Sequence, residues 1–279
     1  MIGNKTLYVT DLDGTLLTPE GCVSDRSARM ITDLTRQGAL ITVATARTPA
    51  TVELLLTDTH TVLPAIVMTG ATLWNRSTMS YTDTSFLDPI TADDIAGRFA
   101  RHGVAPFVYT LDNNKLLKVY HNGEMNEKER DFVAIRRSLA LKQFIIDDPK
   151  GLGASLSEAI MFFAMGDRVR VFALADDLRE NVDCSVSNYV DIFGADTGIL
   201  EVFAPRISKA EAVKRLAKSV NADRIVVFGD NLNDIPMLQV ADTAVAVGNA
   251  LPEVKVVADV VIGDNTTDAV ARYIAEDFN

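Results

Sequence analysis

The sequence predicts an α/β fold, a doubly wound parallel sheet of the Rossmann-like type that is interrupted by an α+β insertion. Near-continuous apolar runs alternate with helix-like segments in the first third of the chain, and the alternation returns after residue 199. Strands that are apolar on both faces are typical of a parallel sheet covered by helices on both sides. From about 84 to 198, hairpin-like segments and helices replace this alternation. We therefore expect a discontinuous core domain, 1–83 and 199–279, and an inserted domain, 84–198.

The first half of the core is predicted from apolar runs and helix signals. A helix is expected over 24–38, because Ser24 is a good N-cap and apolar residues follow at helical spacing until Gly38. A second helix is expected over 48–59, with Pro49 in its first turn. The expected strands of this half are 6–10, 39–45 and 64–70.

The rest of the chain divides into the second half of the core and the insertion. In the insertion we expect helices over 91–103 and 125–140, and a hairpin over 105–120 with its turn at 112–114. The segment 159–175 fits a strand–turn–strand unit or, in part, a helix. The core elements expected after the insertion are helices over 208–220, 233–241 and 265–278 and strands over 224–230, 243–248 and 259–262.

The composition is acidic and poor in cysteine. The chain has 279 residues, and 27 basic against 38 acidic residues give a net charge of −11. This balance suits neither a nucleic acid backbone nor an anionic membrane, so we expect neither partner. The two distant cysteines, Cys22 and Cys184, predict reduced thiols and no zinc site. Because no signal-peptide core or membrane-spanning run is visible, a cytoplasmic location is the expectation.

Acidic and polar residues gather where the predicted parallel strands end. The carboxyl ends of such strands meet at one edge of the sheet, so these side chains are expected to lie together. Four carboxylates at one edge would repel each other unless a cation neutralised them, and Mg²⁺ prefers such oxygen ligands. The set comprises Asp11, Asp13 and Thr15, then Thr45 and Arg47, then Lys209, and finally Gly229, Asp230, Asn233 and Asp234.

Four segments together resemble the motifs of the haloacid dehalogenase superfamily. "DLDGTL" at 11–16 resembles the first motif, "VATAR" around Thr45 the second, "ISKAEAV" around Lys209 the third and "GDNLNDIPML" at 229–238 the fourth. The place of the insertion resembles the Cof-type branch, whose members carry a type IIB cap. The resemblance covers the whole chain. It implies a Mg²⁺-dependent phosphatase that hydrolyses a small phosphate monoester, such as a sugar phosphate, through an aspartyl-phosphate intermediate.

The resemblance also implies roles for the matching residues. Asp11 would attack phosphorus as the nucleophile, and Asp13 would protonate the leaving alcohol and then activate water. Gly14 would allow the sharp exit that frees both acids. Thr45 and Lys209 would hold phosphoryl oxygens.

The metal site and its support are implied in the same way. Asp230 would bind Mg²⁺ together with the carboxylate of Asp11 and the backbone carbonyl of Asp13. The cap would close over the site, exclude water and select the substrate. Support would come from Asp234 (holding the metal's waters or Lys209), Asn233 (fixing the loop) and Arg47 (contacting substrate or forming a surface ion pair).

Three positions depart from the family pattern, and none removes a catalytic group. Alanine replaces glycine at Ala46 and Ala210. Thr69 stands where relatives usually carry an asparagine, so any substrate contact through that amide is in question. Candidates for cap specificity are Asp112, Asn113, Lys115 and Arg168.

Other functions remain open at this stage. A phosphorylatable signalling switch of the receiver type also uses acids, a threonine and a lysine on a doubly wound sheet, although its acids are usually adjacent. A phospho-ligand binding protein without turnover is a second alternative, and a phosphomutase is a third within the same superfamily. The substrate and the oligomeric state have no readable code in the sequence.

Overall fold

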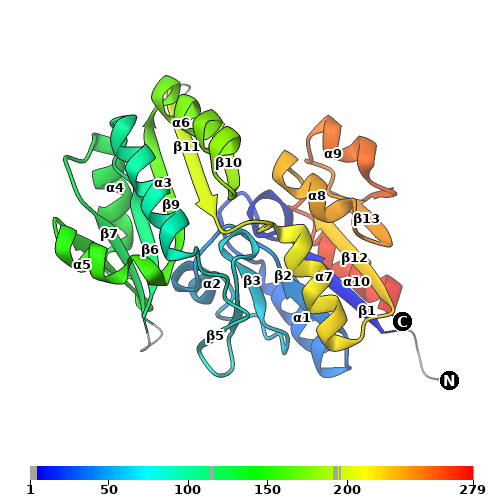
Figure 1. The fold of residues 1–279 in the computed structure, drawn as a ribbon. Helices are drawn as coiled ribbons and strands as arrows, with labels where there is room; N and C mark the ends of the chain where they lie inside the picture. Colours follow the sequence, from blue (N-terminus) through cyan, green and yellow to red (C-terminus); the bar gives the residue numbers. More distant parts are fainter. Residues whose placement is uncertain (1–4, 113–115, 191–193, 195, 279) are drawn as a thin grey trace. The chain divides into compact units, whose positions relative to one another are not determined.

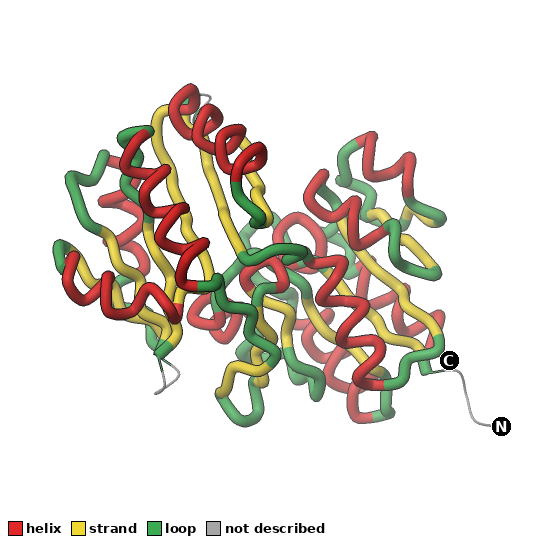
Figure 2. The backbone as a smooth tube through the Cα atoms, viewed as in Figure 1, coloured by secondary structure: helices red, strands yellow, loops and turns green. Residues whose placement is uncertain are grey.

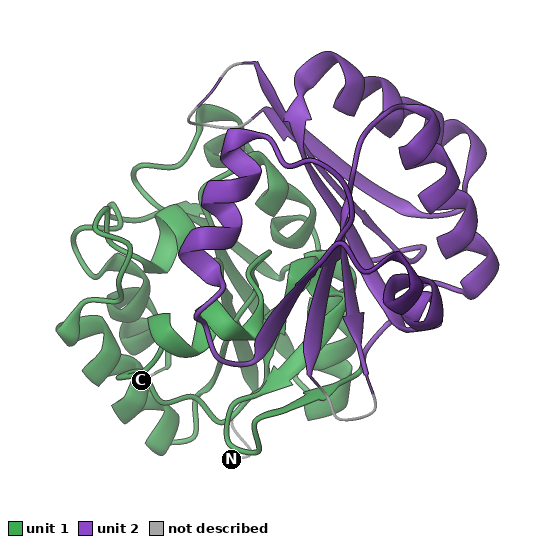
Figure 3. Ribbon diagram, turned by 90° about the vertical axis from the view of Figure 1, so that its left-hand side faces the viewer, with its two compact units in different colours: residues 1–83, 208–279 green, residues 84–207 purple. Residues whose placement is uncertain are grey.

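The computed structural model describes residues 5–112, 116–190, 194 and 196–278 (Figure 1). The chain forms two units, one from residues 1–83 and 208–279 and one from residues 84–207 (Figure 3). The sequence predicts junctions after residues 83 and 198, and the first boundary between the two units lies between Asp83 and Thr84. The second lies between Ile207 and Ser208 rather than between 198 and 199, because the strand Thr197–Phe203 pairs within the sheet of the insertion.

Unit 1 is built on a parallel sheet with the strand order β14-β13-β12-β1-β2. Its central strands come from the two ends of the chain, since Thr6–Thr10 pairs in register with Arg224–Gly229. Apart from the half-buried Ile225, the apolar side chains of both strands are buried, which is why the strands appear in the sequence as continuous apolar runs. The predicted doubly wound α/β core is confirmed. The strands are β1 Thr6–Thr10, β2 Leu40–Val43, β12 Arg224–Gly229, β13 Thr243–Ala246 and β14 Val260–Val261.

Helices cover both faces of this sheet (Figures 1 and 2). α1 and α10 pack against each other and contact β2 and β1, whereas α7 and α8 pack together and α8 contacts β12 and β13. The predicted cap of α1 is present, because the Ser24 side chain accepts the N–H of Ser27 at 3.0 Å. The helices are α1 Asp25–Arg36, α2 Pro49–Leu55, α7 Lys209–Val220, α8 Ile235–Leu238, α9 Pro252–Val257 and α10 Ala269–Phe278.

The third predicted strand leaves the main sheet early. β3 (Ala65–Val67) touches the main sheet through the parallel bridge between Ala44 and Ile66. It then pairs antiparallel with β4 (Thr72–Asn75), which pairs with β5 (Ser80–Thr82). The expected run 64–70 is cut short because residues 68–70 all have positive φ angles, which no strand can contain.

Unit 2 is an α+β domain, as predicted. Its sheet has the order β10-β11-β9-β6-β7-β8, antiparallel except for the pair β7–β8. The predicted hairpin is β6 and β7, while its turn residues 113 and 114 lie outside the described residues. The strands are β6 Phe107–Leu111, β7 Leu117–His121, β8 Lys142–Ile146, β9 Ala159–Asp167, β10 Ser185–Val190 and β11 Thr197–Phe203, and the helices are α3 Pro89–Arg101, α4 Glu127–Arg136, α5 Pro149–Ser155 and α6 Arg168–Asn181.

The segment 159–175 is a strand followed by a helix, so its strand–turn–strand reading is wrong. The side chain of Asp167 accepts the N–H of Arg170 at 3.0 Å and starts α6. Val171, Leu174 and Leu178 are then buried at helical spacing. The alternation of charged and apolar residues that suggested a second strand extends over little more than the first turn of this helix.

Candidate active site

The turn after β1 carries the two acids of the first motif. The backbone N–H of Asp11 donates to the carbonyl of Phe228 at 3.0 Å, which keeps Asp11 in line with the sheet. The side chain of Asp11 is buried, while that of Asp13 is 56% exposed. Gly14 then turns the chain with a φ of +76°, and a Cβ at this position would overlap the carboxylate of Asp230. Glycine is therefore required here by both backbone conformation and close approach.

A buried lysine joins two carboxylates from distant parts of the chain. Lys209 Nζ lies 2.5 Å from Asp11 Oδ1 and 2.8 Å from Asp234 Oδ1. Lys209 is the first residue of α7, whose N-cap Ser208 accepts the N–H of Glu211 at 3.1 Å. Burial by itself disfavours the ammonium, but the two carboxylates hold the pKa of Lys209 above its ordinary value. The lysine is therefore charged, and it is fixed at the end of the sheet.

The loop after β12 is organised around Asp234. Asp234 Oδ2 accepts the backbone N–H groups of Asp230 at 3.1 Å and Asn231 at 3.2 Å. With Oδ1 bound to Lys209, both oxygens of this fully buried carboxylate are in use. Asp230 remains partly exposed, and its Oδ1 accepts the hydroxyl of Thr15 at 3.0 Å. Asp234 thus shapes the loop, and Asp230 presents its carboxylate to the site.

Three carboxylates lie close enough to hold one metal ion. Oxygens of Asp11, Asp230 and Asp234 all lie within 4.8 Å of one another. With the single ammonium of Lys209, this cluster keeps two negative charges when ionised, which a divalent cation would balance. Burial raises the pKa of Asp11 to about 7 against the opposing effect of Lys209, and burial and Asp234 raise the pKa of Asp230 to about 6. The donor set, all oxygen and partly buried, suits Mg²⁺.

Asp13 and the second motif form a separate ion pair beside this cluster. Arg47 donates from Nε to Asp13 Oδ2 and from Nη2 to Asp13 Oδ1, both at 2.7 Å. The backbone N–H of Arg47 donates to Thr45 Oγ1 at 3.1 Å, and Thr45 is buried. The bidentate contact explains why the Asp13 carboxylate does not join the other three.

The remaining predicted residues have different surroundings. Asn233 is exposed, next to the buried Asp234. In unit 2, Asp112 pairs with Lys118 at 2.9 Å and accepts the N–H of Leu116, so it stabilises its own hairpin. Arg168 opens α6, and positions 113 and 115 lie outside the described residues.

Sequence reasoning missed Asn249. Its Nδ2 donates to the carbonyl of Gly14 at 2.7 Å, and its Oδ1 accepts the N–H of Asn265 at 2.9 Å. It therefore ties the turn after β1 to the C-terminal part of unit 1. Asn249 follows β13, so the rule that strand ends share one edge would have found it if applied to that strand as well.

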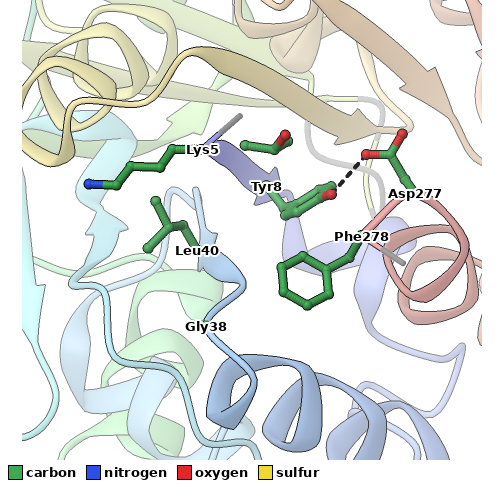
Figure 4. Close-up of a pocket in the computed structure, with 7 residues that line it drawn as sticks. Lys5, Tyr8, Gly38, Leu40, Asp277 and Phe278 are labelled. Atoms are coloured by element: carbon green, nitrogen blue, oxygen red, sulfur yellow. Dashed lines mark hydrogen bonds between the residues drawn. The ribbon is translucent and has the colours of Figure 1, made fainter. Parts of the chain in front are cut away.

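A cavity of about 270 Å³ lies at the opposite end of β1 (Figure 4). Tyr8 points across it and donates its hydroxyl to Asp277 Oδ2 at 2.8 Å. Arg224 also donates to both oxygens of Asp277, which satisfies this carboxylate. The cavity is lined by Lys5, Thr6, Tyr8, Gly38, Leu40, Asp277 and Phe278, at the amino ends of the strands and away from Asp11.

The fold and the carboxylate–lysine cluster together define a class of protein. A buried carboxylate, an ammonium and a group of carboxylates that could hold a divalent cation, all at the carboxyl edge of a doubly wound sheet, are the parts that phosphoryl transfer needs. The family profile of haloacid dehalogenase-like hydrolases matches residues 8–274. The chain belongs to this family, and it is a phosphoric monoester hydrolase.

Several phosphatases are similar to the chain in sequence. The 5-amino-6-(5-phospho-D-ribitylamino)uracil phosphatase YcsE of Bacillus subtilis (strain 168) is 26% identical over 274 residues, which cover 96% of this chain and 94% of that protein. Pyridoxal phosphate phosphatase YbhA of Escherichia coli (strain K12) is 54% identical over 66 residues, which cover 22% of this chain and 24% of YbhA.

Solved structures agree with the fold over nearly the whole chain. A haloacid dehalogenase-like hydrolase from Bacteroides thetaiotaomicron has a TM-score of 0.77 at 19% identity and covers 98% of this chain and 99% of its own. The subclass IIB sugar phosphatase BT4131 has a TM-score of 0.72 at 18% identity, with 98% and 99% coverage. Within the described residues, no helix has both the length and the apolarity to cross a bilayer. The cytoplasmic location stays a prediction.

Proposed function

We propose that this protein is a Mg²⁺-dependent phosphatase that hydrolyses a small phosphate monoester through a phosphorylated Asp11. The observation that carries the proposal is the buried bridge from Lys209 to Asp11 and Asp234, with Asp230 beside it. A lysine held at 2.5 Å orients one oxygen of Asp11 and offsets its charge. The other oxygen remains for attack on phosphorus.

In the first half-reaction, a carboxylate oxygen of Asp11 forms a bond to phosphorus, and the bond from phosphorus to the ester oxygen breaks. Asp13 gives a proton to the departing alkoxide, so that an alcohol leaves. Both oxygens of Asp13 accept from Arg47 in this structure, so this ion pair has to open before Asp13 can carry a proton and donate it. A positioned general acid typically contributes about 10²–10⁴-fold in rate.

In the second half-reaction, water attacks the phosphorus of the aspartyl-phosphate, and Asp13 takes up the proton of that water. The bond from phosphorus to Asp11 breaks, which releases inorganic phosphate and restores both acids. Lys209 and the Thr45 segment hold phosphoryl oxygens in both steps. Mg²⁺, held by Asp11, Asp230 and the backbone carbonyl of Asp13, would supply positive charge to the transferring group.

Support for the substrate class comes from the relatives. The YcsE and YbhA proteins are named for a ribitylaminouracil phosphate and for pyridoxal phosphate. A third relative, from Sulfurisphaera tokodaii, is a phosphoglycolate phosphatase, 28% identical over 178 residues. These substrates are all small phosphate monoesters. We place sugar phosphates first in the substrate panel. The proposed binding partner of the site is a small phosphorylated metabolite.

A turnover assay tests the proposal. The protein is incubated with p-nitrophenyl phosphate and a panel of sugar phosphates, with Mg²⁺ and then with EDTA. We expect multiple turnovers that stop with EDTA and are abolished by Asp11→Asn. The matched control is Asp33→Asn, because Asp33 is an exposed acid on α1 whose ion pair with Arg36 lies on the surface. Its activity should equal that of the wild-type protein.

The assay also separates the alternatives. A receiver-type switch would hold phosphate on an aspartate without repeated turnover. A binding protein would bind phosphate esters and hydrolyse none. A phosphomutase would return an isomeric sugar phosphate in place of inorganic phosphate. Each of these outcomes would contradict the proposed hydrolysis.

A further inference from the structure

The turn at residues 68–70, between β3 and β4, has an unusual backbone. Met68 has a φ of 50°, Thr69 of 57° and Gly70 of 91°. A β-branched residue such as threonine rarely adopts positive φ, and each such non-glycine residue costs about 1–3 kcal/mol. Such strain persists only where surrounding contacts impose it. The contacts of this turn therefore indicate its role.

On one side, the turn holds the second motif. The backbone N–H of Met68 donates to the carbonyl of Arg47, and that of Thr69 donates to the carbonyl of Thr45, both at 3.0 Å. The N–H of Thr45 donates in turn to the carbonyl of Ile66 at 3.0 Å. These bonds fix both ends of the segment that carries Thr45 and Arg47. A regular strand at 68–70 could not direct both N–H groups to it.

On the other side, the turn packs against the start of α7. A Cβ built on Gly70 would overlap the carbonyl oxygen of Ser208 and would lie 2.9 Å from Ala212 Cβ. The carbonyl of Gly70 accepts from Arg215 Nη2 at 3.1 Å. Ser208 is the N-cap residue of α7, directly before Lys209. The backbone of the turn is thus in contact with the residue that precedes the catalytic lysine.

We infer that the turn at 68–70 is a positioning element that sets the distance between Thr45 and Lys209, the two groups proposed to hold the phosphoryl oxygens. This inference rests on the proposed function. The turn touches no reacting atom, and it acts through the two segments that it joins. The positive φ angles let the turn contact the Thr45–Arg47 segment and the start of α7 at once. Because Gly70 has no side chain, its backbone can approach that of Ser208 closely.

The main test is Gly70→Ala, with Gly38→Ala as the matched control. Gly38 also has a positive φ, of 104°, but a Cβ there meets nothing within 4 Å. Both variants add backbone strain, and only the first pushes α7 away from the turn. The readout is the inhibition constant of inorganic phosphate against p-nitrophenyl phosphate hydrolysis. This constant does not depend on how much of the enzyme is folded.

We expect Gly70→Ala to raise the inhibition constant of phosphate about tenfold or more, because small misplacements of binding groups are costly. Gly38→Ala should leave it within about twofold of wild type, as distant sites act independently. If Gly70→Ala lowers only the maximal rate and leaves the inhibition constant unchanged, the turn has a merely structural role and the inference is wrong.

A second pair of variants decides the matter if Gly70→Ala does not fold. Arg215 donates to Gly70 and also pairs with Asp83 at 2.8 Å. Arg215→Met removes both contacts, whereas Asp83→Asn removes only the ion pair. We expect Arg215→Met to weaken phosphate inhibition about threefold, as the loss of one hydrogen bond would, and Asp83→Asn to leave it unchanged. Equal effects of the two would overturn the inference.

The proposed function and this inference fail in different ways. If the wild-type protein hydrolyses no phosphate ester, the proposed function is wrong. Isothermal titration of the same variants with inorganic phosphate then tests the turn without turnover. Equal phosphate affinity in wild type and Gly70→Ala would reject the positioning role.

Discussion

Replacing Lys209 with methionine tests the buried bridge at the centre of the site. The ammonium makes charge-assisted hydrogen bonds of 2.5 Å to Asp11 and 2.8 Å to Asp234. Each such bond contributes about 1.5–3 kcal/mol, and removal of one partner of a buried ion pair destabilises by about 3–5 kcal/mol. We therefore expect Lys209→Met to lower the free energy of unfolding of the metal-free protein by about 3–5 kcal/mol. The loss should be larger at pH 8 than at pH 5, because burial raises the pKa of Asp11 to about 7 and its carboxyl is therefore neutral at pH 5.

The assay is urea unfolding in EDTA, followed by the fluorescence of the single tryptophan, Trp74, which is buried. Lys218→Met is the control, because Lys218 is an exposed lysine on the same helix and should change stability by less than about 0.5 kcal/mol. Phosphatase activity should fall about 10²–10³-fold in Lys209→Met, as loss of one charge-stabilising group does elsewhere. A variant as stable and as active as the Lys218→Met control would refute the reasoning.

Three further outcomes are expected. Thr15→Val removes the 3.0 Å hydrogen bond to Asp230 and should weaken Mg²⁺ activation several-fold, about 1 kcal/mol; a MgCl₂ titration with an unchanged midpoint would contradict this. In the metal-free protein, the raised pKa values of Asp11, about 7, and Asp230, about 6, mean that their contribution to stability is lost as pH rises through 6–7. Mg²⁺ should therefore raise Tm more at pH 8 than at pH 5, and equal gains in a thermal-shift assay would count against a site at these carboxylates. Thr69→Asn replaces a β-branched residue at a φ of 57° and should stabilise by about 1 kcal/mol, so a lower Tm would reject the strain argument.

Local sequence patterns were sufficient for much of the fold. Apolar runs marked β1 and β12, and the cap at Ser24 marked the start of α1, because such signals depend on neighbouring residues alone. The strand-end rule also indicated which polar residues would meet. It worked for Asp11 and Asp230 because parallel pairing brings the ends of β1 and β12 to one edge.

Where local signals were ambiguous, long-range packing determined the outcome. The segment after Asp167 alternates like a strand, yet it buries Val171 and Leu174 as a helix. The second domain junction moved to residue 207 because β11 found its partners in unit 2. Strand pairing of this kind depends on segments far away in the chain, so no local window contains it.

The acids, the lysine and most of the strands of the core can be read from the chain, since they follow from residue type and local periodicity. The partners with which these groups pair cannot be read from the chain. Lys209 reaches Asp11 across 198 positions, and Asp13 turns to Arg47 and away from the other carboxylates. Which charges pair depends on through-space distance and burial, and both exist only once the sheet has assembled.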